Sequence, residues 1–198
     1  HVNNRHAMPP LVLASTSPFR RELLTRLNIH FETAAPDVDE SPRPGETPDA
    51  LVRRLSEAKA RAVGESRHGL IIGSDQVAAT GTDILGKPGT HERAATQLQQ
   101  LSGKTVIFHT GLCLLDSGNG ELQLDVVPFR VVFRQLDAGQ IERYLQHDQP
   151  YNCAGSFKSE GLGITLFERM DGDDPTALIG LPLIRLTTML ARAGIALP

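Results

Sequence analysis

The sequence predicts an α/β protein with a mixed sheet. Short apolar runs, typical of buried strands, alternate along the chain with segments whose apolar residues recur every three or four positions, as in amphipathic helices. Neither a repeat nor a low-complexity stretch interrupts this alternation. The 198 residues, 40% of them hydrophobic, can bury a substantial core, so we expect a single domain over 8–198. Residues 1–7, which precede Met8, are interpreted as a tag remnant outside the fold.

The first strand and helix contain the most informative pattern. An apolar run from Leu11 breaks into hydroxyl residues, and Ser17 followed by proline predicts a helix start. Arg20 and Arg21 fall in the first turn, where a cation opposes the helix dipole by a few tenths to about 1 kcal/mol. An anion would offset this cost, so the hydroxyls of Ser15 and Ser17, free backbone N–H groups and both guanidiniums predict a phosphate site; two solvated arginines are the alternative. The expected apolar face holds Phe19, Leu23, Leu24 and Leu27.

An acidic, proline-rich segment and a second helix come next. Residues 37–46, which include Glu40, have no helical or strand periodicity, so we expect a loop beside a site. Thr47 and Pro48 begin a helix by the same cap-then-proline logic. Lys59 falls inside the apolar stripe of this helix, where a lysine can bury its stem and extend its ammonium to solvent. The stripe contains Leu51, Val52, Leu55, Ala58, Ala62 and Val63.

A carboxylate is expected at the end of the following strand. The buried run 70–72 leads into a glycine and a serine and then into Asp75 and Gln76. Ligands of α/β sheets bind at such strand ends, which makes Asp75 a candidate for the site.

The second half of the chain continues the alternation. Two of its loops contain lysines: Lys87 lies between Gly86 and Pro88, and Lys158 lies in the glycine-punctuated loop 153–163. The remaining elements are expected in this order: a helix over 90–101, strands over 106–115 and 122–127 joined by a hairpin turn, a strand over 130–136, a helix over 137–146, a strand over 164–169 and a helix over 182–193.

Cationic and acidic side chains are distributed over these turns and helices in a way that suits a polyphosphate. A triphosphate needs several cations, and its cleavage needs carboxylates that hold a divalent metal or orient water. The cations are Arg20 with Arg21, Lys59, Lys87 and Lys158, and the acids are Glu40, Asp75 and Glu160.

Composition disfavours several other classes of protein. A net charge of −3 gives no general attraction to nucleic acids, and no apolar run approaches the length of a membrane span. Two cysteines are too few and too far apart for a zinc cluster or a disulfide framework, so we expect a reducing, cytoplasmic setting. Cys153 is a candidate nucleophile, but the sequence identifies no partner base for it.

Six motifs, in order along the chain, together resemble the Maf family of nucleoside triphosphate pyrophosphatases. The resemblance extends from Leu11 to about Gly194. It implies an inosine-triphosphate-pyrophosphatase-like fold, in which two lobes flank a central cleft, and a homodimer. The motifs are 15–21, Asp39 with Glu40, Lys59, 73–76, 86–88 and 156–161.

Three positions relate to the base that family members accept. Members that cleave dTTP and UTP have Arg, Thr and Gln where this chain has Phe19, Gln76 and Glu160. The set in this chain is similar to the YceF-type subfamily, which prefers N7-methyl-GTP. The Glu160 carboxylate can accept both donors of a guanine edge, and an aromatic face suits a cationic methylated base.

The resemblance also implies a reaction and the residues that perform it. The reaction is hydrolysis to the nucleoside monophosphate and pyrophosphate, which keeps modified nucleotides out of nucleic acids. Asp75 is the implied proton acceptor, with Glu40 and Lys87 catalytic, and Mg²⁺ or Mn²⁺ near Glu40 and Asp75. The implied substrate-binding residues are Ser15, Ser17, Arg20, Arg21, Lys59 and Lys158. The alternatives are a dTTP/UTP-type pyrophosphatase, a phosphatase that releases orthophosphate, and a nucleotide-binding regulator of septum formation without turnover.

Overall fold

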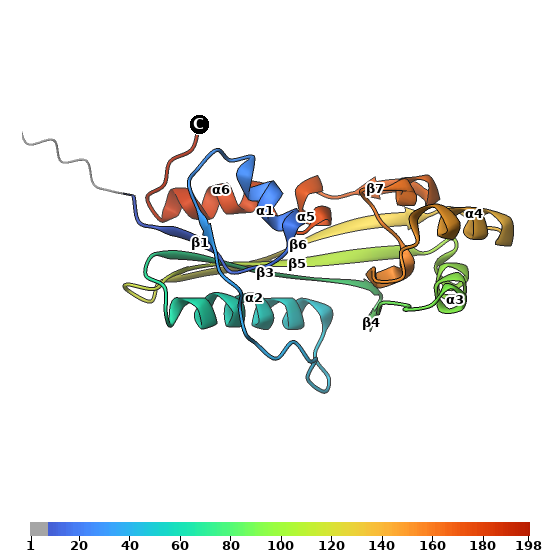
Figure 1. Cartoon of the computed structure of the whole chain (residues 1–198), viewed down its shortest axis with the longest axis horizontal. Helices are drawn as coiled ribbons and strands as arrows, with labels where there is room; N and C mark the ends of the chain where they lie inside the picture. The colour runs from blue at the N-terminus through green and yellow to red at the C-terminus, as the bar shows by residue number, and fades with distance from the viewer. Residues whose placement is uncertain (1–7) are drawn as a thin grey trace, which may run out of the picture.

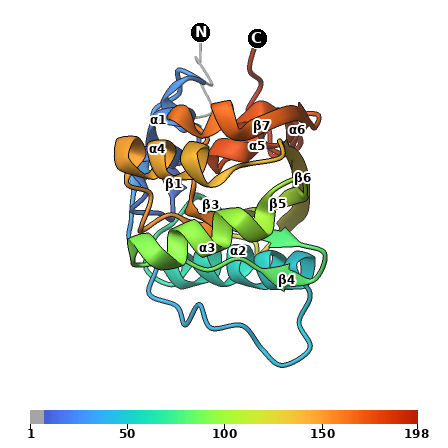
Figure 2. The same ribbon diagram turned by 90° about the vertical axis from the view of Figure 1, so that its right-hand side faces the viewer.

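The computed structural model describes residues 8–198, which form one mixed sheet with helices on both faces and at one end (Figures 1 and 2). The interpretation of residues 1–7 lies outside the described residues. Strand order is β2-β1-β3-β5-β6-β7, with β4 paired to β3. β2 and β3 run parallel to β1, and all other pairs are antiparallel, which confirms the predicted mixed α/β class. The strands are β1 (Leu11–Leu13), β2 (Glu32–Thr33), β3 (Leu70–Thr80), β4 (Asp83–Ile84), β5 (Thr105–Asp116), β6 (Leu122–Phe133) and β7 (Phe167–Asp171).

The helices surround the sheet in three groups. Figure 1 shows α2 on one face, α1, α5 and α6 on the other, and α3 and α4 together at one end. No helix in the part of the chain that the structure describes is both long enough and apolar enough to cross a membrane. The α-helices are α1 (Pro18–Thr25), α2 (Pro48–Gly64), α3 (His91–Leu101), α4 (Ala138–Asp148), α5 (Pro175–Ile179) and α6 (Leu183–Arg192), and the short 3-10 helices are η1 (Ala154–Ser156) and η2 (Leu162–Leu166).

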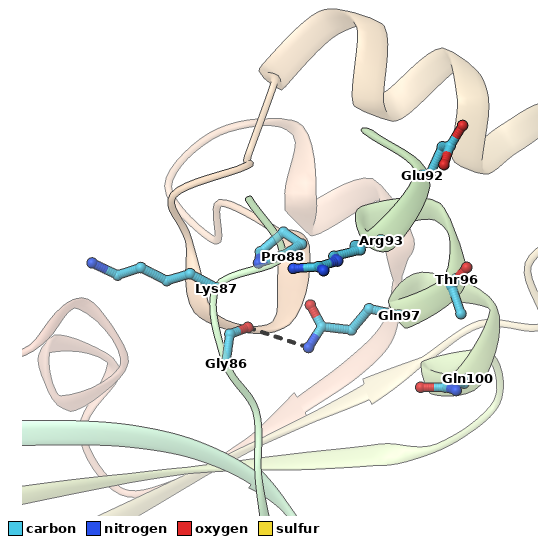
Figure 3. Close-up of a pocket in the computed structure, with 8 residues that line it drawn as sticks. All are labelled: Gly86, Lys87, Pro88, Glu92, Arg93, Thr96, Gln97 and Gln100. Carbon is cyan, nitrogen blue, oxygen red and sulfur yellow. Dashed lines mark hydrogen bonds between the residues drawn. The ribbon is translucent and has the colours of Figure 1, made fainter. Parts of the chain in front are cut away.

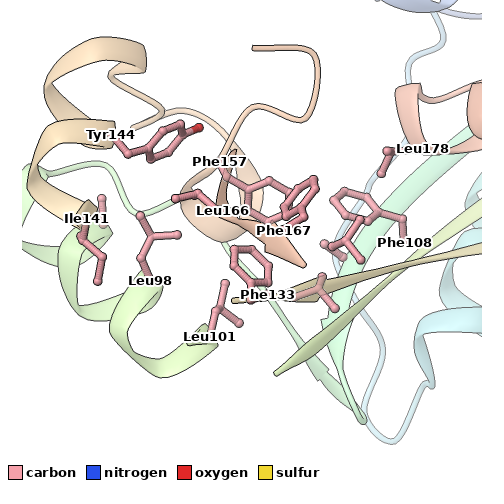
Figure 4. Close-up of a cluster of buried hydrophobic side chains, with 14 of the residues drawn as sticks. Leu98, Leu101, Phe108, Phe133, Ile141, Tyr144, Phe157, Leu166, Phe167 and Leu178 are labelled. Atoms are coloured by element: carbon pink, nitrogen blue, oxygen red, sulfur yellow. The ribbon is translucent and has the colours of Figure 1, made fainter. Parts of the chain in front are cut away.

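The apolar core has separate parts at the two ends of the long strands. At one end Ile72 packs among residues of α1 and α6, while Ile71 packs under α2. At the other end Ala78 belongs to a cluster with side chains of α3 and α4, in which four phenylalanines stack edge to face with ring centroids 5.2–5.6 Å apart (Figure 4). Strands β3, β5 and β6 run through both parts. Residues between the two parts are therefore free to be polar.

The predicted end of strand β3 is wrong. The strand does not stop after the apolar run but continues to Thr80, so Asp75 and Gln76 lie in its middle. Pairing with β5 extends from Leu70 to Ala79. The backbone of the polar residues 73–76 is therefore hydrogen-bonded to β5. Asp75 therefore lies between the two parts of the core.

Two other predictions of strand extent are also wrong, and one short helix was missed. The two strands predicted over 122–127 and 130–136 are one strand, β6. Pro128 is tolerated there because β7 pairs with β6 only from Arg130 onward, so one side of β6 is an open edge at the proline. The strand predicted from 164 begins at Phe167, after η2. Helix α5 was not predicted because five residues are too few to show a period.

The predicted helix caps are confirmed. Ser17, Thr47 and Asp137 each accept a hydrogen bond from the backbone N–H three residues later. Thr90, predicted as the first residue of its helix, caps α3 in the same way. The predicted apolar face of α1 is correct for its leucines but wrong for Phe19, whose side chain is 48% exposed while Leu23 and Leu24 are buried.

Candidate functional site

Close packing of α2 on the sheet positions the centre of the site. A side chain at Gly73 would collide with the backbone of α2 at Ser56 and Ala60, and one at Gly111 would collide with Val52. Glycine at both positions therefore lets the helix lie directly on β3 and β5. Lys59 extends from this helix toward Asp75.

The ammonium of Lys59 joins two carboxylates. Its Nζ lies 2.8 Å from Oε1 of Glu40 and 2.9 Å from Oδ1 of Asp75. Lys59 is 7% exposed, so its ammonium pairs with these groups rather than extending into solvent. The Asp75 side chain is 14% exposed, whereas that of Glu40, on its loop, is 60% exposed. One acid is thus built into the sheet, and the other approaches from a loop.

A pocket of about 330 Å³ lies beside this pair, at the start of α1. Ser15, Ser17 and Arg20 line it together with Glu40 and Lys59. Burial lowers the pKa of the Arg20 guanidinium, and the charges of Asp75 and Glu40 act in the opposite direction. The pocket therefore combines hydroxyls, a helix N-terminus and two cations, a set that suits an anionic group.

The two arginines of α1 lie in different pockets. Arg20 Nε donates to the carbonyl oxygen of Gly180 at 2.7 Å and faces the pocket just described. Arg21 lines a separate pocket of about 630 Å³ with His30 and Arg67. Consecutive helical residues point about 100° apart, which explains the separation. The sequence prediction placed both guanidiniums at one phosphate site, and the structure brings only Arg20 to it.

The loop of Lys87 belongs to the other end of the molecule. The amide of Gly89 donates to the carbonyl of Tyr151 at 2.9 Å, and Gln97 Nε2 donates to the carbonyl of Gly86 at 3.3 Å. Figure 3 shows Lys87 extended away from Arg93 and the other residues that line the pocket of about 410 Å³ beside α3. The backbone of the turn is thus fastened while the ammonium stays exposed.

Lys158 and Glu160 lie near Lys87, around Cys153. Burial raises the pKa of the Cys153 thiol, and the charges of Lys158, Glu160 and Lys87 all act on it. A nucleophilic cysteine needs a lowered pKa, so this environment speaks against the candidate nucleophile. Tyr144 fixes the loop by accepting a hydrogen bond from the amide of Lys158 at 2.7 Å.

The three positions linked to base choice lie on different elements. Phe19 is exposed on α1, and Glu160 is exposed in the loop before η2. Gln76 is half-buried in β3, where its amide nitrogen donates to Thr110 Oγ1 and to two carbonyls of α5.

Sequence reasoning missed several residues that shape this site. Thr110 is fully buried and donates to the carbonyl of Ala177 at 2.8 Å. With His109 and Gly111 it interrupts the apolar run of β5. Such a break inside a strand is a usable sign of close backbone approach. The role of Gly180 has no comparable local sign, because its partner Arg20 is 160 residues away.

The carboxylates form no complete metal centre by themselves. Within residues 8–198, no group of three or more His, Cys, Asp or Glu side chains is arranged to hold a metal ion. Glu40 and Asp75 supply hard carboxylate oxygens, and Mg²⁺ in nucleotide sites is commonly held by one or two carboxylates together with substrate phosphates. The residues present therefore fit a cation that is shared with a polyphosphate.

Known proteins resemble this chain over most of its length. The model of the Maf family, described as Maf-like protein, matches residues 10–193. A Nitrosococcus oceani protein named 7-methyl-GTP pyrophosphatase is 61% identical over 189 residues, which cover 95% of each chain. A Pseudomonas aeruginosa protein with the same name is 56% identical over 192 residues, which cover 96% of this chain and all of that protein.

A solved structure shares the fold at low sequence identity. The HAM1 protein from Coxiella burnetii superposes with a TM-score of 0.52 at 15% identity, covering 93% of this chain and 100% of that one. This likeness confirms the fold class that the resemblance implied. The family match and the relatives at 56–61% identity lead to one identification: the chain belongs to the Maf family.

Proposed function

We propose that this protein hydrolyses N7-methyl-GTP to N7-methyl-GMP and pyrophosphate and thereby keeps the modified nucleotide out of nucleic acids. One observation carries the proposal: the paired carboxylates of Glu40 and Asp75, joined by Lys59, lie beside an anion pocket at the start of α1. The names of relatives at 56–61% identity support the choice of substrate. Residues 8–198 would act as one catalytic domain.

The phosphate chain would bind between the two ends of the molecule. Arg20, Lys59 and the hydroxyls of Ser15 and Ser17 offer donors on one side. Lys87 and Lys158 offer ammonium groups from the loops of the other end. Donors held in place before the reaction stabilise charge as it develops on the leaving pyrophosphate, without a cost of reorganisation.

Asp75 is suited to accept the proton of the attacking water. Its Oδ1 bonds to the Lys59 ammonium, which leaves Oδ2 for the water. As the water attacks phosphorus, its proton moves to the carboxylate, the α–β anhydride bond breaks, and the bond electrons leave with pyrophosphate. The position of Asp75 in the middle of β3, with its side chain only 14% exposed, holds this carboxylate in a defined place.

Glu40 and Asp75 are also the residues that would hold a divalent cation, Mg²⁺ or Mn²⁺, together with the substrate phosphates. When bound, the cation would supply charge neutralisation on the phosphate oxygens. Because Glu40 comes from the exposed loop, it can shift toward such a cation, while Asp75 stays in the sheet.

Glu160→Gln is expected to lower kcat/KM for N7-methyl-GTP and GTP about 5- to 150-fold, and to change dTTP hydrolysis much less. An amide cannot accept both guanine donors, and a donor left unpaired against it once the base is bound costs about that much. Steady-state kinetics on the four triphosphates, UTP included, measure the effect. Glu168→Gln, an exposed residue on β7, is the matched control. Equal losses on purine and pyrimidine substrates would remove Glu160 from base recognition.

Arg20→Ala is expected to raise KM and lower kcat together, by about 10- to 100-fold in kcat/KM, because a charged donor on phosphate acts in both the ground and transition states. Arg21→Ala is expected to have a clearly smaller effect, since Arg21 lines a different pocket. Arg53→Ala on α2 serves as the control for the effect on kcat/KM of removing an arginine outside these pockets. Equal effects at Arg20 and Arg21 would show that both guanidiniums reach the phosphates, as the sequence alone predicts.

Identification of the products across a panel of triphosphates tests the proposal as a whole. We expect pyrophosphate, a divalent-metal requirement, and the highest kcat/KM with N7-methyl-GTP. Release of orthophosphate would favour a phosphatase. Tight nucleotide binding without turnover would favour a nucleotide-binding regulator. A preference for dTTP and UTP would favour the pyrimidine type. The homodimer and the cytoplasmic setting that the sequence implies stay predictions.

A further inference from the structure

The side chains of Gln76 and Thr110 fasten the end of α5 to the sheet. Gln76 Nε2 donates to the carbonyls of Ala177 at 2.9 Å and Leu178 at 3.0 Å, and lies 3.0 Å from Thr110 Oγ1. Thr110 Oγ1 donates to the same Ala177 carbonyl at 2.8 Å. The last carbonyls of a helix have no partner within it, and here two strands supply the donors. Both N–H groups of Gln76 are committed to this contact.

The segment that follows α5 leads directly to the phosphate pocket. The carbonyl of Gly180 accepts from Arg20 Nε at 2.7 Å. Ser74 Oγ lies 3.2 Å from the same carbonyl and 2.7 Å from that of Gly111. Gly180 ends the helix with φ +134°, a conformation that other residues rarely adopt. Because Arg20 is held through its Nε, the position of Gly180 determines how the rest of the guanidinium faces the pocket with Glu40.

We propose that Gln76 and Thr110 are positioning residues that hold α5 so that the Gly180 carbonyl orients Arg20 toward the substrate phosphates. This inference rests on the proposed function. It gives Gln76 a different role from the one that the sequence comparison suggests, since the amide donors face α5 and not a base. A threonine at position 76 is too short to reach both α5 carbonyls. Substitution of Gln76 by threonine therefore weakens the contacts that position Gly180 and, through it, Arg20.

Two variants that remove these donors test the proposal. Gln76→Glu keeps the size of the side chain but removes both donors, and Thr110→Val keeps the shape of the other side chain but removes its hydroxyl. We expect both to lower kcat/KM about 5- to 150-fold by the same factor on every triphosphate, because an unpaired buried carbonyl lets α5 shift. In an Arg20→Ala background, neither should lower it much further. Gln76→Thr replaces Gln76→Glu if the latter fails to fold.

A matched control separates this role from the general loss of a hydroxyl. Thr187 Oγ1 donates to the carbonyl of Leu183 at 2.8 Å, a bond within α6 that involves neither the carbonyls of α5 nor Arg20. Thr187→Val should leave kcat/KM close to the wild-type value. If Thr110→Val is as mild as Thr187→Val while Gln76→Glu changes the rank order of bases, then Gln76 contacts the base and the proposal is overturned.

Amide hydrogen exchange without nucleotide provides a measurement that does not depend on activity. The amides of Gly180 and Leu181 donate to the carbonyl of Thr176, so they report on the end of α5. We expect faster exchange of the peptide 174–182 in Gln76→Glu and Thr110→Val, and no change in Glu160→Gln or Thr187→Val. Unchanged exchange in both Gln76→Glu and Thr110→Val would contradict the proposal. Absence of pyrophosphate release by the wild-type protein would instead overturn the proposed function and leave the exchange result standing.

Discussion

Asp75→Asn is expected to lower kcat by about 10²- to 10⁴-fold, the usual cost of losing a general base. The amide keeps the size of the side chain, and its oxygen can still accept the bond from Lys59. Nucleotide affinity should therefore change by much less than kcat. Pyrophosphate release under single-turnover conditions, together with equilibrium binding of N7-methyl-GTP, separates the two effects.

The control for this substitution is Asp83→Asn, on the exposed strand β4. It removes the same charge and should leave kcat unchanged. Wild-type rates of pyrophosphate release by a folded Asp75→Asn protein would exclude Asp75 from proton transfer.

Lys59→Met is expected to lower kcat/KM on the order of 10²-fold, the size typical for removal of one preorganised charge-stabilising group. It removes the cation between Glu40 and Asp75 and leaves two neighbouring carboxylates. The loss of stability should be smaller than the roughly 3–5 kcal/mol of breaking a fully buried pair, because the Glu40 side chain is 60% exposed. Urea unfolding measures this loss.

A conservative variant tests whether the charge of Lys59 is what matters. Lys59→Arg keeps a cation between Glu40 and Asp75 and should restore kcat/KM in part. If Lys59→Arg is as impaired as Lys59→Met, then the charge of Lys59 does not support the two carboxylates.

Local signals in the sequence were sufficient for much of the fold. The caps of α1, α2, α3 and α4 are short-range hydrogen bonds between a side chain and a nearby amide, so Ser17 or Asp137 can be recognised without knowledge of the tertiary structure. Strand boundaries depend on partners instead. β3 continues through Asp75 because β5 pairs with it there, and nothing local to residues 73–76 announces this.

The sequence predicted which residues form the site better than it predicted how they are arranged. The sequence singled out Glu40, Lys59 and Asp75, and the structure brings these three together. The sequence could not show that Arg20 and Arg21 lie in different pockets, because that depends on which side of α1 faces Gly180. The hydrogen bonds from Gln76 and Thr110 to α5 could not be predicted either, since their donors and acceptors lie more than 60 residues apart in the sequence.

The central claim is that water attacks the α-phosphorus of the nucleotide in a pocket served by Asp75. Hydrolysis of N7-methyl-GTP in isotopically labelled water, followed by mass spectrometry of both products, tests it most directly. We predict that the heavy oxygen appears in N7-methyl-GMP and that the pyrophosphate is unlabelled. Label in the pyrophosphate, or release of orthophosphate as the first product, would contradict it.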